Sequence, residues 1–145
     1  MDADAPRKDI PLPELVAYAL RQGIAQVQAV GSPLNPFFLD EAGNVYFLFD
    51  GGKGIDPMAM ALQAIQEKAP NIRRAVLIVD SRIAFADGKK WDAIVAMGCE
   101  REGGDGAVFA QRYVPKGLFR KFRVEGEQEE VAGCRNFIEA ALAPV

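Results

Sequence analysis

The feature of this sequence that most constrains its fold is the unbroken apolar run Ala75–Val79, which is rich in β-branched residues. Such a run needs cover on both faces, so it predicts a strand in the middle of a sheet. Further along, Asp87 and Gly88 form a pair that favours a tight hairpin between apolar segments. Trp91–Met97 is then predicted to be the returning strand. The fold should therefore contain a central antiparallel pair of strands.

Other apolar segments extend this sheet. Phe37–Leu39 and Val45–Phe49 are separated by the loop-forming stretch Glu41–Asn44, which predicts a second hairpin. Ala107–Val114 is predicted to be a strand that Pro115 ends, and Leu118–Val124 a last short strand. Because hairpins join consecutive strands, we expect the sheet to be mainly antiparallel.

The first segment with helical spacing of apolar residues begins at Pro13, a residue that suits the first turn of a helix. Gly23 leaves two interpretations open. It can end a short helix, with residues 24–30 extended, or it can lie within a helix that continues to about Ala29. We favour the long helix because Gln26 and Gln28 are good helix formers.

Two further helices are predicted from their start signals. Asp56 followed by Pro57 is typical of a helix N-terminus, with the aspartate capping free amides, and this helix should end near Lys68. Carboxylates favour the positive end of a helix dipole, so the glutamates that follow Glu125 predict the start of a final helix. Those glutamates are Glu127, Glu129 and Glu130, and the apolar stripe of this helix is Val131, Phe137, Ile138, Ala141 and Leu142.

The sequence therefore predicts an α+β fold with the order α-β-β-α-β-β-β-(β)-α. We expect a single, mainly antiparallel sheet of five to six strands with helices packed on it. Residues 1–10 are predicted to be a flexible leader and residues 11–145 a single domain, since no repeat or composition shift divides the chain.

The 145-residue composition excludes several kinds of chemistry. The chain has no His and no Thr, and its only serines are Ser32 and Ser81. Without an imidazole, neither a Ser-His-Asp nor a Cys-His arrangement can be built within one chain. Two cysteines, Cys99 and Cys134, cannot supply a four-ligand structural zinc site. We therefore expect no cofactor and no metal site.

Net charge and hydropathy limit the partners and the cellular location that we expect for the protein. The net charge of −3 gives no global attraction to nucleic acid or to an anionic membrane. No apolar run approaches the roughly 20 residues that span a bilayer, and no secretory signal is recognisable at the N-terminus. Two cysteines fit a reducing compartment. We expect a cytoplasmic protein without a membrane partner, and the abundance of Ala, Gly and Arg is typical of a bacterial chain.

Three stretches of this sequence carry a resemblance to known proteins. They are residues 87–93 (DGKKWDA), residues 110–122 (AQRYVPKGLFRKF) and residues 32–37 (SPLNPF). With them, most of the chain resembles a family of small uncharacterised bacterial proteins of similar length, for which no activity is implied. The predicted order of elements is also similar to that of profilin-like and roadblock domains. Folds of that shape often serve as dimeric adaptors, although a fold does not imply a function.

The strongest candidate for a binding site is the basic-aromatic segment 111–124. No carboxylate lies between Asp105 and Glu125, and guanidinium groups beside aromatic faces suit phosphate, carboxylate or single-stranded nucleic acid. The alternative is a strand pair whose aromatic residues enter the core while its basic groups are solvated. The candidate ligand-binding residues are Arg112, Tyr113, Lys116, Arg120, Lys121 and Arg123, together with the aromatic residues Phe119 and Phe122.

Other candidates have stronger structural explanations. The glycine-rich stretch 50–54 lies between a strand and a helix but lacks the spacing of a phosphate-binding loop. The carboxylates near predicted sheet ends, notably Asp80, Asp92 and Glu100, suggest a magnesium-dependent hydrolase only if they converge. Cys99 is expected to be a small core residue, Cys134 an inert residue of the last helix, and Trp91 a core anchor.

The missing catalytic residue types favour a binding function. Our leading hypothesis is a non-catalytic binding or adaptor module that forms homodimers, with a second copy or another protein as partner. The alternative is an anion or nucleic-acid binder that uses segment 111–124, although nucleic acid is not favoured. The carboxylate-metal hydrolase is a third possibility.

Overall fold

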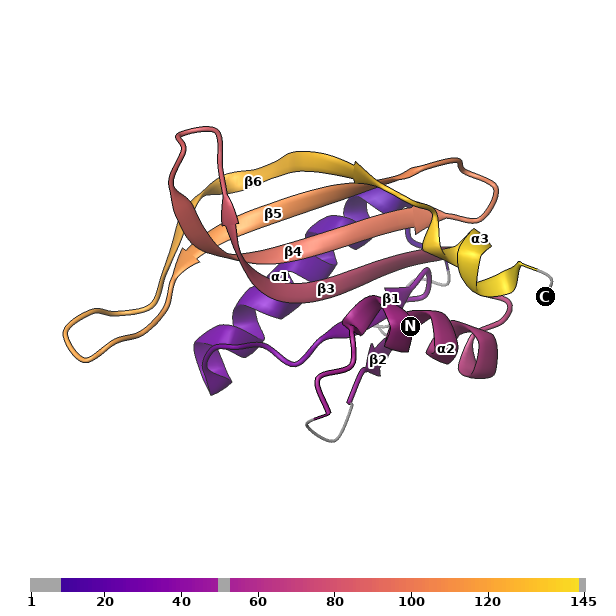
Figure 1. Cartoon of the computed structure of the whole chain (residues 1–145), viewed down its shortest axis with the longest axis horizontal. Coiled ribbons are helices and arrows are strands. Elements are labelled where there is room, and N and C mark those ends of the chain that lie inside the picture. The colour runs from indigo at the N-terminus through magenta and orange to yellow at the C-terminus, as the bar shows by residue number, and fades with distance from the viewer. Residues whose placement is uncertain (1–8, 50–52, 144–145) are drawn as a thin grey trace, which may run out of the picture.

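The computed structural model describes residues 9–49 and 53–143, which form an α+β fold with one six-stranded antiparallel sheet and three helices (Figure 1). The strand order across the sheet is β2-β1-β3-β4-β5-β6. The elements are α1 (Leu12–Val30), β1 (Phe37–Asp40), β2 (Val45–Phe47), α2 (Pro57–Lys68), β3 (Arg74–Ala84), β4 (Lys90–Glu100), β5 (Gly106–Val114), β6 (Arg123–Cys134) and α3 (Phe137–Leu142). None of these helices is long and apolar enough to span a bilayer.

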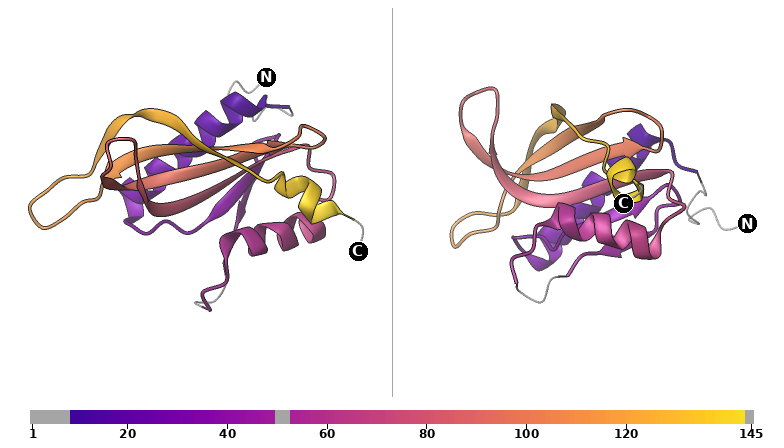
Figure 2. Two further views of the ribbon diagram at one scale, coloured as in Figure 1. Left: turned by 45° about the horizontal axis from the view of Figure 1, so that its top comes forward. Right: turned by 45° about the vertical axis from the view of Figure 1, so that its right-hand side comes forward.

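The helices lie on opposite sides of the sheet. Helix α1 crosses one face, while α2 and α3 pack together on the other face near one end (Figure 2). At the opposite end, the β3–β4 and β5–β6 hairpins both extend beyond the helices (Figure 1). One end of the sheet is thus covered by α2 and α3, and its opposite end consists of two projecting hairpins.

The core between α1 and the sheet confirms the long first helix. Leu15, Val16 and Ala19 are buried against Ile78 and Ile94 of the central strands. Gly23 does not interrupt the helix, and α1 packs closely against the sheet at this position. A Cβ atom there would lie 2.7 Å from Cγ2 of Ile94, so only glycine permits this approach.

The run Ala75–Val79 lies where the sequence predicts it, between β1 and β4. Val76 and Ile78 face α1, whereas Ala75 and Leu77 belong to the core beneath α2 and α3. Alternation of side chains along the strand thus buries both faces of the same segment. This explains why the run is apolar without interruption.

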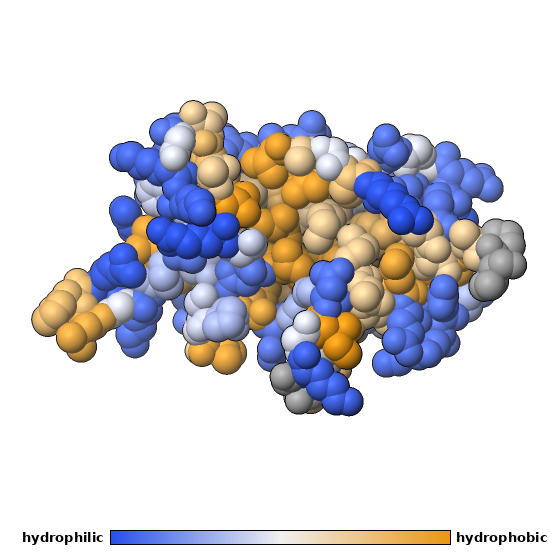
Figure 3. Space-filling model, in the orientation of Figure 1, coloured by the Kyte–Doolittle hydropathy of each residue, from blue (hydrophilic) through white to orange (hydrophobic). Residues whose placement is uncertain are grey.

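The face that carries α2 and α3 is only partly covered. Beyond these helices it continues as an apolar surface over β3, β4 and β5, visible in the middle of the molecule in Figure 3. Val79, Ile83 and Val108 are half-buried there, and Val79 also packs against the cluster beneath α2 and α3. Trp91 is also half-buried on this surface, so it anchors a small outer cluster rather than the main core.

The predicted final helix is wrong over most of its length. Residues 123–134, including Glu127, Glu129 and Glu130, form strand β6, and α3 begins only at Phe137. Pairing with β5 supplies backbone hydrogen bonds, and an edge strand leaves the glutamates in water. The short helix α3 is capped by Asn136, whose Oδ1 accepts from the backbone N–H groups of Ile138 and Glu139 at 3.1 and 3.2 Å.

Two local expectations also change. Asp56 precedes α2, but its side chain makes no capping hydrogen bond. Strands β3 and β4 are each 11 residues long, so their hairpin extends well past the predicted segments. Residues 1–8 of the predicted leader lie outside the described part of the chain, and its last residue, Ile10, donates its backbone N–H to the carbonyl of Glu41 at 2.7 Å.

Candidate functional site

The basic-aromatic segment does not form one surface, and Arg112 shows why. Its side chain lies on the face opposite α1, with its guanidinium carbon 5.0 Å from the ring centre of Phe85 and 5.2 Å from that of Trp91. The nearest carboxylate is Asp87, at 3.8 Å. Cation–π contacts and an ion pair already engage this guanidinium, so Arg112 stabilises the β3–β4 hairpin against β5.

Tyr113 points to the other face and is fully buried in the α1 core. Its hydroxyl donates to Asp80, at 2.8 and 2.9 Å from the two carboxylate oxygens. Asp80 also accepts from the Leu34 backbone N–H at 2.9 Å and from the Ser32 hydroxyl at 3.2 Å. Burial raises the pKa of Tyr113, and the bond to Asp80 raises it further. This network fastens the loop after α1 to the sheet.

The remaining candidate residues lie in and beside the loop between β5 and β6. Lys116, Arg120 and Lys121 are exposed there, and Arg123 pairs with Glu125 at 3.5 Å. Phe122 turns inward and its ring lies 5.7 Å from that of Tyr113, whereas Phe119 is 94% exposed. The structure therefore separates this segment into core residues and a solvated basic loop.

Arg120 takes part in a basic cleft that the sequence analysis did not predict. The cleft has a volume of about 290 Å³ and lies between the β3–β4 and β5–β6 hairpins. Its charged lining comprises Arg82, Lys89, Lys90 and Arg120 against the single carboxylate of Asp92, which pairs with Arg82 at 3.3 Å. The Asp87-Gly88 turn predicted this hairpin, but only the sheet order brings its basic residues to Arg120.

The carboxylates that suggested a metal site do not converge. Asp92 and Glu100 stand near opposite ends of β4, about 26 Å apart at 3.3 Å per residue. Asp80 is engaged by Tyr113 and Leu34, and Glu100 pairs with Arg74 at 3.0 Å. Among residues 9–49 and 53–143, no three acidic or cysteine side chains are placed to hold a metal ion.

The cysteines and the glycine-rich stretch add no reactive group. Cys99 is buried as expected, and burial raises the pKa of its thiol to about 11. Cys134 is half-buried at the end of β6, not in a helix, and burial also raises its pKa. In the stretch 50–54, residues 50–52 lie outside the described part of the chain.

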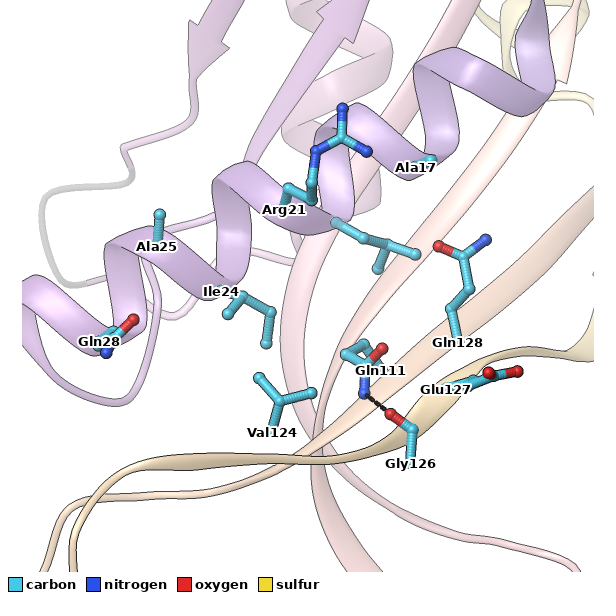
Figure 4. Close-up of a pocket in the computed structure, with 11 residues that line it drawn as sticks. Ala17, Arg21, Ile24, Ala25, Gln28, Gln111, Val124, Gly126, Glu127 and Gln128 are labelled. Atoms are coloured by element: carbon cyan, nitrogen blue, oxygen red, sulfur yellow. Dashed lines mark hydrogen bonds between the residues drawn. The ribbon is translucent and has the colours of Figure 1, made fainter.

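A large groove lies between α1 and β6. It has a volume of about 610 Å³. Leu20, Ile24 and Val124 make it apolar, and Figure 4 shows Ile24 and Val124 pointing toward each other across it. The other lining residues are Ala17, Arg21, Ala25, Gln28, Gln111, Gly126, Glu127 and Gln128. We call this surface the α1–β6 groove.

One wall of the groove is a bulge in β6. The register passes from Arg112 opposite Glu125 to Ala110 opposite Glu129, so residues 126–128 lie opposite Gln111 alone. The Gln111 side-chain amide fills the gap by donating to the carbonyl of Gly126 at 3.0 Å (Figure 4) and to that of Glu125 at 3.3 Å. Bulges re-aim a strand and are frequent beside binding sites.

Strand β6 as a whole is acidic, but the groove itself is lined by one of its carboxylates, Glu127. Strand β6 carries Glu125, Glu127, Glu129 and Glu130 within six residues, and all except the half-buried Glu125 are exposed. On the opposite wall, Arg21 is the charged lining residue. The groove therefore has an apolar floor with one carboxylate and one guanidinium at its rim, and the other glutamates lie along the same edge strand outside this lining.

Sequence reasoning missed this groove because it predicted a helix for the residues that form the bulge. A signal was present in Gly126, which interrupts a polar run and has a φ of +70°. Comparisons with protein-family models, with curated proteins and with solved structures gave no match to this chain. The resemblances inferred from the sequence therefore stay predictions.

Proposed function

We propose that this protein is a non-catalytic binding module that takes up apolar side chains of a protein partner in the α1–β6 groove. The observation that carries the proposal is the groove itself, with Ile24 and Val124 facing each other above a floor that includes Leu20. A large apolar concavity with a few polar groups at its rim is the usual form of a binding site.

The chemistry of the rim defines the partner. Gln28 and Gln128 can donate to and accept from peptide groups. The glutamates of β6 favour a partner that carries lysine or arginine next to its apolar residues. The absence of histidine and the wide separation of Asp92 and Glu100 support a role without catalysis.

A short basic peptide tests this proposal. The probe is the hexapeptide Lys-Lys-Leu-Phe-Lys-Lys, titrated into dilute protein and followed by amide chemical shifts. We expect shifts centred on Ile24 and Val124, and weaker binding of the matched peptide Glu-Glu-Leu-Phe-Glu-Glu. Ala25→Arg, which places a large cation in the groove, should abolish binding.

The control for this experiment is Ala59→Arg, which changes an equally exposed alanine on α2 outside the groove. It should bind the peptide as the unmodified protein does. Shifts that persist in Ala25→Arg, or equal binding of the acidic and basic peptides, would refute the groove as the site.

A second function is favoured by the basic cleft. Four basic side chains against one carboxylate give this 290 Å³ cleft a net charge of +3, which suits a phosphate-bearing ligand. We propose anion or single-stranded nucleic-acid binding as the alternative function. Its affinity for a single-stranded oligonucleotide should fall steeply as salt is added.

Charge reversal separates this alternative from nonspecific attraction. Lys89→Glu with Lys90→Glu should abolish oligonucleotide binding at low salt, while Lys53→Glu with Lys68→Glu should leave it within about twofold because those lysines are exposed elsewhere. Equal losses in both double variants would show that only net charge matters and would remove the cleft from consideration.

A further inference from the structure

The tip of the β5–β6 hairpin has an unusual composition. Gly117 donates its backbone N–H to the carbonyl of Arg120 at 3.0 Å, which leaves Leu118 and Phe119 as the two apex residues of a tight turn. Such positions are normally occupied by Gly, Asn, Asp, Pro or Ser. Leu118 is 90% exposed and Phe119 94% exposed, and the apolar tip stands out at the far left in Figure 3.

The hairpin holds this apex away from the body of the molecule. The Gly117–Arg120 pairing closes the turn, and Phe122 anchors the base of the loop against Tyr113. Lys116, Arg120 and Lys121 surround the apex and are all exposed. The tip therefore presents two large apolar side chains inside a collar of positive charge.

The edges of the sheet are poorly suited to pairing with another chain. Strand β6 is bulged at residues 126–128 and again at Val131, and it carries four glutamates, which would repel the same strand of a second copy. Strand β2 at the other edge has only three residues. Association of two copies must therefore use side-chain surfaces.

We propose that the β5–β6 tip of one copy inserts into the α1–β6 groove of a second copy, and that the exchange is reciprocal. The inference rests on the proposed function, because it names the partner of the same groove. Leu118 and Phe119 match the apolar floor around Ile24, and the basic collar meets the acidic strand β6. Reciprocal contacts of this kind produce a closed two-fold dimer.

Within one chain the tip does not reach the groove. Phe119 is five residues from Val124, the groove residue nearest to it along the hairpin, which corresponds to roughly 16 Å of extended chain. Because the tip points outward and lies at this distance from the groove, the tip of each molecule is suited to enter the groove of the other. Each copy then contributes one anchor and one pocket.

The oligomeric state of three proteins tests the proposal by sedimentation equilibrium. The unmodified protein should be a dimer, while Leu118→Ser with Phe119→Ser, and separately Ala25→Arg, should each raise the dissociation constant tenfold or more. These positions are exposed, so the variants should keep the fold. Phe49→Ser and Ala59→Arg are exposed controls outside both surfaces and should remain dimeric.

Mixing the tip variant with the groove variant tests whether the tip of one copy binds the groove of the other. The tip variant keeps an intact groove and the groove variant keeps an intact tip, so one of the two contacts re-forms between them. A heterodimer should therefore appear at concentrations at which each variant alone is monomeric. A dimer that survives in the tip variant, or the lack of a heterodimer, would overturn the proposal.

The peptide titration distinguishes failure of the proposed dimer from failure of the proposed binding function. If the unmodified protein is monomeric but Lys-Lys-Leu-Phe-Lys-Lys still binds the groove, the second copy is excluded and the binding function stands. Because a dimer would fill its own grooves, the peptide is also titrated into the monomeric tip variant; if it does not reach the groove there and Ala25→Arg leaves the dimer intact, both proposals fail. Sedimentation of a monomeric protein with phosphatidylserine vesicles, lost in the tip variant, would assign the tip to a membrane and overturn the dimer.

Discussion

Gly23 shows how one missing side chain determines the packing of an entire helix. It lies in the middle of α1, where glycine weakens a helix by about 1 kcal/mol relative to alanine. At this position, however, a Cβ atom would lie 2.7 Å from Ile94 and 3.2 Å from Ile78, both buried β-branched residues. The close approach of α1 to the sheet therefore requires glycine.

The variant Gly23→Ala tests this balance. Overpacking of a rigid core costs about 1–3 kcal/mol, which exceeds the gain in helix propensity. We expect the free energy of unfolding in urea to fall. The comparison is Gln22→Ala, the adjacent helical position without such a contact, which should stay within about 0.5 kcal/mol. An increase in stability for Gly23→Ala would show that α1 and the sheet can move apart enough to accept the added methyl group.

Two tyrosines make the protein sensitive to alkali. Burial raises the pKa of Tyr113, and burial with a hydrogen bond to Asp40 raises that of Tyr46 to about 12, from an ordinary value of 10. A raised pKa means that the folded state keeps its proton longer than the unfolded state does. The resulting stability is fully present below pH 10 and is lost as the pH rises through the folded values.

The measurement is urea unfolding from neutral pH to about pH 12. The unmodified protein should keep a constant tyrosine contribution up to pH 10 and then lose stability. Tyr113→Phe should be less stable by about 1–2 kcal/mol at neutral pH, because Asp80 loses a hydrogen bond, and should lose less above pH 10. Parallel curves for the two proteins would contradict the assignment.

For individual residues, the sequence predicted which side chains could bind a ligand but not on which face of the sheet each side chain would lie. Arg112 and Tyr113 are neighbours, so strand alternation sends them to opposite faces of the sheet. The absence of carboxylates around them made the segment look continuous. The partners that engage them, Asp87 and Asp80, lie 25 and 33 residues away and could not be read from local composition.

At the scale of elements, β6 is the strand that the sequence predicted least well. Its glutamates, glutamine, valine and alanine are compatible with a helix, and acidic residues favour a helix start. An edge strand with one face in water tolerates the same composition. The predictions of α1, α2, β3 and β4 are confirmed, because their apolar residues follow helical or strand patterns, and the structure decides in favour of the longer α1 that Gly23 left open.

Two glycines of β6 test the importance of its bulge. Gly126 has a φ of +70°, and a Cβ atom there would lie 2.9 Å from the Arg112 guanidinium, which is held between Phe85 and Trp91. We expect Gly126→Ala to destabilise the protein by about 1–2 kcal/mol and to weaken peptide binding in the groove. Equilibrium unfolding and the hexapeptide titration measure these two effects.

Gly133 provides the matched control on the same strand. Its φ lies outside the left-handed region, and the nearest atom to an added Cβ is the Gly106 carbonyl oxygen at 3.7 Å, an ordinary contact. Gly133→Ala should therefore change stability by less than about 0.5 kcal/mol. Similar losses for the two variants would mean that the bulge geometry carries no special requirement.

At the scale of the whole molecule, stability is distributed unevenly across the sheet. Strands β3 and β4 are paired on both sides and hold several fully buried residues, whereas β6 is an exposed, bulged edge. Local opening is easiest where few buried contacts restrain the backbone. The groove and the projecting tip thus lie on the part of the fold that is least constrained.

Hydrogen exchange should reproduce this gradient. We expect amides of residues 75–79 and 94–97 to exchange slowest, and those of residues 116–121 and 126–128 at least about tenfold faster. A mass-spectrometric time course on the unmodified protein measures both sets together. Equal protection of amides in β6 and β3 would contradict the inference that stability decreases from the central strands to this edge of the sheet.

The strand order also has a consequence for the order of synthesis. Strands β3 to β6 are consecutive hairpins, but β1 pairs with β3, and Asp40 lies opposite Ala75. The apolar residues Phe37, Phe38 and Leu39 therefore leave the ribosome before the strand that covers them has been made. Chains that end at residue 73 should be cleaved readily by protease within β1, and chains that extend past Glu100 should resist it.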